Sequence, residues 1–473
     1  MPSTIQRRED LAGMKVTVMG LGLHGGGLAS AKFLADAGAD VTVTDLRDEK
    51  TLAPSIAAME GRKVRYVLGM HEMSDFSGAD MVIKNPAVKA DSPYLGVSKC
   101  VETDISIFLR FSRSPLVAVT GSKGKSSTAS AIHHGFIASG VHALLGGNIT
   151  VSPLGFLDET AADRPVVLEL SSWQLADMRG KGILKPRIAI LTAIMPDHMN
   201  YYGSMETYVA DKRLIYADQD ANDFTLCNLD QDWGRSFAAE TRGTVAGYCD
   251  ADHGSAGAWF NPDDPPGLAR GYCRLPGAEA WSPGEEIVPA ELAVQGPHMR
   301  RNLLAASLAL RLMGVDASAV RAAAASFPGV EHRLEFFAES DGIRWYNDSA
   351  ATIPQATAAA LESFTTPVVL VTGGTDKNID FSPVREAYRK ARRLILLSGS
   401  GTDKLMMLLR ENGIAFEGPY GDLDTAVDRA AAAAEKGDSV VLSPGCASFG
   451  MFLHEFDRGL RWKEAVRRKL SPA

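Results

Sequence analysis

At roughly 100 to 200 residues per domain, a chain of 473 residues suggests two to four domains. Apolar residues make up 45% of the chain and charged residues 22%, which is typical of a globular protein and excludes a disordered or fibrous one. The net charge is −8 and Lys and Arg are not clustered. Because affinity for phosphate backbones needs clustered cations, we do not expect a nucleic-acid partner.

The cysteines and the N-terminus indicate a cytoplasmic protein. The N-terminal MPSTIQRREDLAG carries charges where a signal peptide needs an apolar core, and no stretch approaches the roughly 18 to 20 apolar residues of a membrane span. We therefore expect neither secretion nor membrane insertion. The cysteines lie far apart without zinc-binding spacing, so we expect reduced thiols at Cys100, Cys227, Cys249, Cys273 and Cys446.

Three segments in which strand and helix patterns alternate follow one another along the chain. In the first, the strand KVTVMG is followed by a glycine-rich turn, the helical SAKFLADAGA, the strand DVTVTD and a further strand in 80–86. The second opens with the strand PLVAVTG, which runs into GSKGKSS and a helix, and continues with strands VVLEL and IAILTAI. Its Gly- and Pro-rich part, about 243–291, predicts hairpins and loops at the edge of a domain.

The third segment starts near residue 330, after a helix NLLAASLALRLMGV that ends near Gly314. Its strands VVLVTGG, LILLSGSG and SVVLSPG are continuously apolar and end in glycine. Such strands, separated by helices, predict a parallel sheet covered on both faces. The fold class is therefore α/β, with domains expected at 1–103, 104–329 and 330–473.

The first glycine-rich turn, GLGLHGGG, matches GxGxxG after a strand, with Asp45 at the end of the next strand. This pattern is a dinucleotide fingerprint, in which a diphosphate lies at a helix N-terminus and a carboxylate meets a ribose. An NAD site is one interpretation. Any other diphosphate fits the same geometry, with Arg47 available to a base or a phosphate, and a purely structural turn is the third possibility.

The second glycine-rich loop, VAVTGSKGKSST, favours a nucleoside triphosphate. Its backbone N–H groups can surround phosphates, Lys125 can reach terminal phosphate oxygens, and the Ser126 hydroxyl can bind Mg²⁺. The spacing departs from GxxxxGK[ST], because Val119 stands where the first glycine belongs.

Other polar residues at strand ends are weaker candidates when each is taken alone. Glu169, in VLELSS, is a plausible Mg²⁺ ligand near the phosphate loop, and His198 follows the next strand. Lys212 reads as an ordinary position on an amphipathic helix. In the last third, polar residues at strand ends and turns suit a ligand cleft and include His298, Asn302, His332, Arg333, Asp348, Thr352, Lys377 and Ser448.

Taken in order, these segments resemble the Mur ligases, the ATP-dependent enzymes that add amino acids to peptidoglycan precursors. The likeness covers nearly the whole chain and is greatest to members that add glutamate to UDP-N-acetylmuramoyl-L-alanine. The motifs that carry it are GLGLHGGG, TGSKGKSS, GGNI, ELSSWQL, DH, K, GPHMRRN, HR, NDS, GGTDK, SPGCASF and RGLRW.

The resemblance implies three domains: an N-terminal Rossmann-like domain that binds UDP, a central ATPase-like domain with the phosphate loop, and a C-terminal Rossmann-like domain that binds the amino acid. The first turn would then hold UDP in place of NAD. The residues implied to contact the UDP substrate are Leu23, His24, Asp45, Arg47, Asn148 and Ser171.

The resemblance also implies an acyl phosphate, formed from ATP and the muramoyl carboxylate and attacked by the glutamate amine, with His198 as a candidate base. ATP would contact Gly121, Ser122, Lys123, Gly124, Lys125, Ser126, Ser127, Asn302, Arg333 and Asp348. Two Mg²⁺ ions would be held by Ser126, Glu169, His198 and a carbamylated Lys212. Glutamate would meet Thr352, Lys377, Ser448 and Phe449, and the protein would be a monomer.

Three departures from the family pattern lie near the expected glutamate site. Ala350 stands where many relatives have a lysine, and Gly450 and Glu455 replace an Asp and an aromatic residue. Because of these departures, the sequence leaves open whether the amino-acid substrate is D-glutamate, L-glutamate or another amino acid. Two other classes also stay open: a dehydrogenase, which leaves the phosphate loop unexplained, and a nucleotide-gated binding protein.

Overall fold

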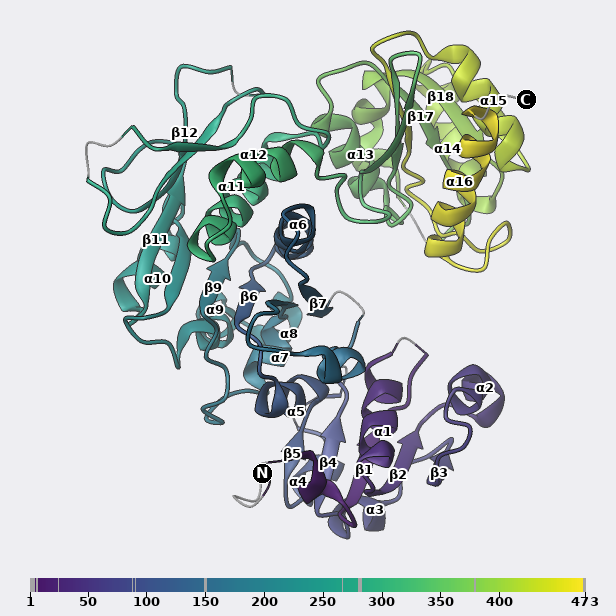
Figure 1. Ribbon diagram of the computed structural model, residues 1–473. Coiled ribbons are helices and arrows are strands. Elements are labelled where there is room, and N and C mark those ends of the chain that lie inside the picture. Colours follow the sequence, from purple (N-terminus) through teal and green to yellow (C-terminus); the bar gives the residue numbers. More distant parts are fainter. Residues whose placement is uncertain are drawn as a thin grey trace. The chain divides into compact units, whose positions relative to one another are not determined.

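The computed structural model describes residues 5, 7–23, 25–86, 88–89, 91–148, 151–265, 267–279, 283–377 and 380–470. They form three β-sheets, which follow one another in chain order in Figure 1. Two compact units divide the chain: the first comprises Met1–Phe260, Tyr272–Glu285 and Leu304–Val320, and the second Asn261–Gly271, Glu286–Leu303 and Arg321–Ala473. Within the described ranges, no helix combines the length and the apolar character needed to span a membrane.

The first sheet has five parallel strands in the order β3-β2-β1-β4-β5. Its strands are β1 (Lys15–Met19), β2 (Asp40–Asp45), β3 (Val64–Leu68), β4 (Met81–Lys84) and β5 (Val101–Glu102). Its helices are η1 (Arg8–Leu11), α1 (Gly26–Asp36), α2 (Glu49–Ala57), α3 (Met73–Ser77), α4 (Pro93–Gly96) and α5 (Asp104–Phe111). The first turn of α1 requires glycine, because a Cβ on Gly27 would lie 1.9 Å from the Gly20 carbonyl oxygen.

The second sheet has nine strands in the order β14-β13-β12-β11-β10-β9-β6-β8-β7. They are β6 (Leu116–Thr120), β7 (Leu144–Gly147), β8 (Val166–Glu169), β9 (Ile188–Leu191), β10 (Phe224–Asn228), β11 (Thr244–Cys249), β12 (Gly257–Phe260), β13 (Gly271–Arg274) and β14 (Glu285–Val288). Helices in this part of the chain are α6 (Lys125–Ala138), η2 (Pro153–Glu159), α7 (Ser172–Ala176), α8 (Met199–Tyr202), α9 (Met205–Lys212), η3 (Arg213–Tyr216), α10 (Asp232–Glu240), α11 (Pro297–Leu312) and α12 (Ala317–Ser326). Every residue of β6, β8 and β9 is buried, as expected of parallel strands covered on both faces.

The expectation of hairpins in 243–291 is wrong for the first pair of strands there. β11 and β12 pair in parallel and extend the sheet. Glycine allows β12 to approach β11 this closely, because a Cβ on Gly257 would lie 2.1 Å from the Gly247 carbonyl oxygen. The same glycines that suggested loops therefore allow close strand pairing.

The third sheet has the order β15-β16-β20-β17-β18-β19, parallel except for the β15–β16 hairpin. Its strands are β15 (Glu335–Ser340), β16 (Ile343–Asn347), β17 (Val368–Thr372), β18 (Ala391–Leu397), β19 (Glu417–Tyr420) and β20 (Ser439–Leu442). The helices are α13 (Pro354–Ser363), η4 (Ser382–Lys390), α14 (Ser400–Glu411), α15 (Leu423–Ala433) and α16 (Glu455–Leu470).

Alternate residues of these strands enter two separate cores. Val369 and Val371 of β17 pack with α15 and α16 residues such as Val427 and Trp462. Val368 and Leu370 belong to the other core, which also contains Leu361, Leu405 and Leu409 from α13 and α14. Helices thus cover both faces, which confirms the parallel α/β architecture expected from the apolar strands.

Candidate active site

The phosphate loop joins β6 to α6 and depends on glycine at its first position. A Cβ on Gly121 would lie 1.9 Å from the Thr192 Oγ1, so another residue there would displace the Thr192 hydroxyl. Gly124 has φ +91° and directly precedes α6, which begins at Lys125. The loop therefore places backbone N–H groups at the N-terminus of a 14-residue helix, where an anion is stabilised.

Side chains and backbone after β9 hold this loop in place. Thr192 Oγ1 donates to the Lys123 carbonyl at 2.7 Å, and Ser122 N donates to the Ala193 carbonyl at 2.8 Å. The Ser122 hydroxyl donates to the Met195 carbonyl at 2.8 Å and lies 3.0 Å from the Tyr208 hydroxyl, which donates to it. Ser122 thus fixes the loop through its side chain.

Two lysine ammonium groups meet at the carbonyl of Gly121. Lys125 Nζ donates to this oxygen at 3.0 Å, and Lys212 Nζ, at the end of α9, donates to it at 2.8 Å. Lys212 is only 1% exposed. Burial, followed by the charge of Lys125, lowers the pKa of Lys212 to about 7, while Asp197 and Asp211 act in the opposite direction. A large share of Lys212 is therefore a neutral amine near pH 7.

Glu169 ends β8 beside the loop, and one of its carboxylate oxygens lacks a partner. Oε1 accepts from Asn148 Nδ2 at 2.8 Å, whereas Oε2 is buried without a hydrogen bond within the described part of the chain. A buried carboxylate oxygen without a donor is costly, and a cation would satisfy it. His198 precedes α8 with φ +54°, is 45% exposed, and its Nε2 lies 3.9 Å from an Asp197 carboxylate oxygen.

These residues suit Mg²⁺ better than a transition metal. Over the described ranges, no group of three or more His, Cys, Asp or Glu side chains is arranged to hold a metal. Mg²⁺ is usually bound through one or two carboxylates together with phosphate oxygens and water. Glu169, with its unpaired oxygen, and Ser126 at the start of α6 provide such an incomplete protein shell.

The glycine-rich turn of the first sheet borders a cavity of about 290 Å³. Leu23, Arg47 and Asn148 line it, so three of the residues expected at UDP meet there. Asp45 supports the turn: its carboxylate accepts from Gly22 N at 3.1 Å and from Arg47 N at 3.0 Å. His24, also expected at UDP, lies outside the described residues.

Asp104, Ser152 and Gln174 also line this cavity, and sequence reasoning did not select them. Ser152 Oγ donates to Asp104 Oδ2 at 2.9 Å, across 48 residues, and burial raises the pKa of Asp104. The Ser171 hydroxyl accepts from Gln174 N at 3.2 Å and donates to Gln174 Oε1 at 3.1 Å, so Ser171 caps α7 beside the cavity. The sequence signal for Asp104 was its place after a capping Thr103, which by itself indicates only a helix start.

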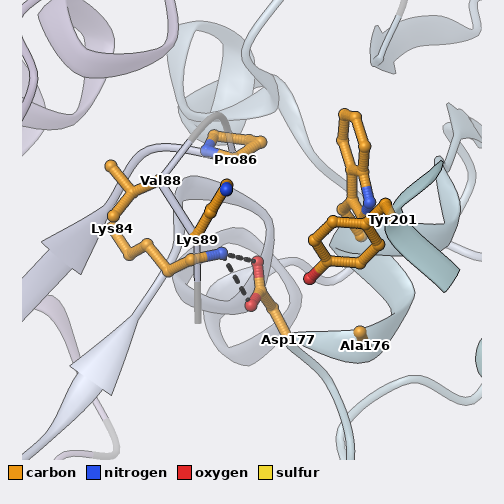
Figure 2. Close-up of a pocket in the computed structure, with 8 residues that line it drawn as sticks. Lys84, Pro86, Val88, Lys89, Ala176, Asp177 and Tyr201 are labelled. Atoms are coloured by element: carbon orange, nitrogen blue, oxygen red, sulfur yellow. Dashed lines mark hydrogen bonds and ion pairs between the residues drawn. The ribbon is translucent and has the colours of Figure 1, made fainter. Parts of the chain in front are cut away.

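A smaller cavity of about 140 Å³ lies between the end of β4 and helices α7 and α8 (Figure 2). Trp173 and Tyr201 form its aromatic walls. Beside them, Lys84 Nζ donates to both carboxylate oxygens of Asp177, at 2.9 and 2.8 Å. This buried ion pair connects the first sheet to α7.

In the second unit, Arg333 and Asp348 lie close together. The Asp348 carboxylate accepts from Ser443 Oγ at 2.7 Å and from Leu334 N at 3.1 Å. Burial raises its pKa to about 7, while these hydrogen bonds and the charge of Arg333 act the other way. Asn302 lies on α11, and no hydrogen bond between described residues joins it to either of them.

The expected glutamate residues gather around the loop after β20. Lys377 Nζ lies 5.3 Å from the centre of the Phe449 ring, and the Thr375 hydroxyl donates to the Phe449 carbonyl. Thr352 directly follows Ala351, whose carbonyl accepts from Gly445 N at 2.8 Å. Ser448 is buried in the same loop, whereas Lys377 and Phe449 are exposed.

Comparison with known proteins identifies the family. The model of the Mur ligase MurD-like N-terminal domain matches residues 14–107, that of the Mur ligase middle domain 119–310, and that of the Mur ligase glutamate ligase domain 332–446. The chain belongs to the Mur ligase family. Its membership excludes the dehydrogenase interpretation, because the glycine-rich turn lies in a Mur ligase N-terminal domain.

Relatives of this Mur ligase match over nearly their full length. A Treponema pallidum protein named "UDP-N-acetylmuramoylalanine--D-glutamate ligase" is 41% identical over 535 residues, covering 98% of this chain and 99% of that protein. A Roseiflexus protein of the same name is 39% identical over 479 residues, covering 97% and 98%. The solved UDP-N-acetylmuramate-alanine ligase of Thermotoga maritima shares the three-domain fold, with a TM-score of 0.58 and 18% identity, covering 96% of this chain and 100% of that one.

We expect Lys125→Ala to lower turnover by about 100- to 1,000-fold, because the mutation removes a positive charge aimed at developing phosphate charge. Thermal unfolding should change little, since Lys125 Nζ donates to the carbonyl oxygens of Gly121 and Ser122 within its own loop. Lys123→Ala is the matched comparison: its side chain is 67% exposed and its Nζ lies 3.9 Å from an Asp197 carboxylate oxygen, so its loss of turnover should be much smaller. Equal losses in the two variants would contradict the loop geometry.

Proposed function

We propose that this Mur ligase joins D-glutamate to UDP-N-acetylmuramoyl-L-alanine at the expense of ATP, in peptidoglycan synthesis. Relatives with that activity in their names match the whole chain. The observation that carries the proposal for the site is the position of Asn148. This residue lines the cavity at the glycine-rich turn and also donates to the Glu169 carboxylate beside the phosphate loop. A substrate bound by its UDP end in that cavity would reach the phosphate loop with its far end.

The first step is attack of the muramoyl-alanine carboxylate on the γ-phosphorus of ATP. This attack releases ADP and leaves an acyl phosphate, with negative charge on the equatorial phosphate oxygens in the transition state. Lys125 and the backbone N–H groups at the start of α6, in residues 124–127, stabilise that charge from fixed positions. Gly121, Ser122, Lys123, Gly124, Ser126 and Ser127 contribute the loop that surrounds the phosphates, and Asn302, Arg333 and Asp348 hold the rest of ATP.

Magnesium, when bound, neutralises phosphate charge and orients the γ-phosphate. Glu169, Ser126, His198 and a carbamate on Lys212 are the proposed protein ligands of two Mg²⁺ ions. Two observations support this set: Glu169 Oε2 is buried without a partner, and Lys212 has a pKa lowered to about 7. A neutral amine is the form that reacts with CO₂, so burial prepares Lys212 for carbamylation.

In the second step, the glutamate amine attacks the acyl carbon and phosphate leaves as the amide forms. The amine must lose a proton, and His198 is the proposed acceptor because it is partly exposed and close to the Asp197 carboxylate. Thr352, Lys377, Ser448 and Phe449 receive glutamate. Asp45 and Ser171 support the UDP site through the turn and the start of α7.

We also propose domains of 1–103, 104–329 and 330–473. The first boundary falls between β5, which ends at Glu102, and α5, which begins at Asp104. The second precedes the loop that leads into β15.

The decisive assay measures phosphate release by the purified protein with ATP, Mg²⁺, UDP-N-acetylmuramoyl-L-alanine and one amino acid at a time. Release should require both the muramoyl nucleotide and D-glutamate, and L-glutamate should give little. Release with ATP alone would favour a nucleotide-gated binding protein. Preference for L-glutamate would leave the ligation in place and overturn the stereochemistry.

Carbamylation of Lys212 can be tested without measuring activity. With isotopically labelled bicarbonate, the protein should show a carbamate resonance that grows as the pH rises through about 7, because the amine then loses its proton. Lys212→Ala should remove the resonance. Lys185→Ala should retain it, since the Asp220 carboxylate raises the pKa of that exposed lysine and keeps it protonated. An unchanged spectrum in Lys212→Ala would exclude the carbamate.

Glutamate recognition should depend strongly on Lys377, because Ala350 cannot provide the cation that many relatives have there. A charge-assisted hydrogen bond corresponds to about 10- to 150-fold in affinity, so Lys377→Met should raise the glutamate KM by about that factor and leave the ATP KM nearly unchanged. Lys390→Met is a control, since Lys390 pairs with exposed Glu362 on the surface. A glutamate KM that stays constant in Lys377→Met would rule out this role.

A further inference from the structure

One face of the C-terminal helix α16 contacts the loop that carries Arg333. Phe456, Gly459 and Lys463 are spaced three and four residues apart, so they share a face of the helix. The Phe456 ring lies 5.3 Å from the His332 ring, between centroids. A Cβ on Gly459 would lie 2.1 Å from His332 Nδ1, so the helix and the loop can approach this closely only with glycine there.

Lys463 forms the strongest polar contact of this face. Its side chain is 8% exposed, and Nζ donates to Glu331 Oε1 at 2.7 Å and to Glu335 Oε1 at 2.8 Å. The other oxygen of Glu335 accepts from His332 N at 3.0 Å and from Asn347 Nδ2 at 2.9 Å. Glu335 therefore connects the ammonium group of α16 to the backbone of the loop.

The loop needs such support because its backbone is strained. His332 has φ +64° and Leu334 has φ +46°, a region that residues with side chains rarely adopt. These two residues flank Arg333, so their conformation decides where its exposed guanidinium points. Strained conformations persist only where surrounding contacts over-determine them. In this loop, the contacts include two hydrogen bonds: His332 N donates to the Glu335 carboxylate and Leu334 N donates to the Asp348 carboxylate.

We propose that Lys463 is a positioning residue for the nucleotide: by holding Glu335, it fixes the 330–335 loop and with it the direction of Arg333, which is proposed to bind ATP. The proposal rests on the proposed role of Arg333 in ATP binding. Lys463 itself does not touch the substrate. Its effect on ATP should therefore pass entirely through Arg333.

The test measures the ATP KM of the full-length protein, with the other substrates saturating, together with thermal unfolding. Lys463→Met keeps the length of the side chain and removes the charge, and it should raise the ATP KM about five- to tenfold, with little change in the KM for the muramoyl nucleotide. Lys463→Arg keeps two donors for the carboxylates and should return the ATP KM to within about twofold of the original value. If Lys463→Met does not fold, Glu335→Gln and Glu331→Gln replace it: the first should raise the ATP KM more, because only Glu335 bonds the loop backbone.

Lys469→Met is the control on the same helix. Its Nζ lies 2.7 Å from Asp428 Oδ1 in an exposed pair, so both the ATP KM and the unfolding temperature should stay the same. A lower unfolding temperature in Lys463→Met with an unchanged ATP KM would mean that Lys463 only stabilises the domain, and would overturn the proposal.

A double-mutant cycle separates this inference from the proposed function. In an Arg333→Ala background, Lys463→Met should have no further effect on the ATP KM. A full additional effect would show that the lysine does not act through Arg333. If Arg333→Ala alone leaves the ATP KM unchanged, the proposed role of Arg333 is wrong, and the inference fails with it.

Discussion

The absence of a side chain at Gly121 is the constraint on which the phosphate loop depends. Thr192 occupies the space where a Cβ would stand, and its hydroxyl holds the next turn of the loop through the Lys123 carbonyl. The same glycine presents the carbonyl at which Lys125 and Lys212 meet. Gly121 thus shapes the anion site and presents the carbonyl that both lysines contact, while burial and the charge of Lys125 lower the pKa of Lys212.

Buried polar groups connect the rest of the site to this loop. Asn148 contacts the Glu169 carboxylate on one side and borders the UDP cavity on the other. Among the described residues, Glu169 Oε2 has no hydrogen-bond donor, and a bound cation would stabilise this oxygen. In the second unit, the buried carboxylate of Asp348 accepts from Leu334 N beside Arg333, and burial raises its pKa.

Much of the fold and part of the site could be predicted from the sequence, because local patterns determine them. Apolar strands ending in glycine predicted the three sheets, and TGSKGKSS predicted the loop before α6. Contacts between distant residues could not be predicted. Asp45 was expected at a ribose, yet its carboxylate holds the turn, and Lys463 reaches Glu335 across 128 residues. Composition also gave a wrong prediction for β11 and β12: hairpins were expected, but the glycines there allow two parallel strands to pair closely.

The buried ion pair between Lys84 and Asp177 has a consequence for the energetics of binding. Together with the pair of Lys181 and Glu102, it joins parts of the chain that already share one apolar core, from Val18 and Ile83 to Leu168 and Leu191. The two nucleotide-binding loops of the first unit therefore belong to one cooperative folding unit, whereas the C-terminal sheet has cores of its own. A ligand that binds only the folded state stabilises the whole unit that holds it. If the muramoyl nucleotide binds in the cavity that Asn148 lines, it should therefore stabilise the whole first unit, including the phosphate loop, against unfolding.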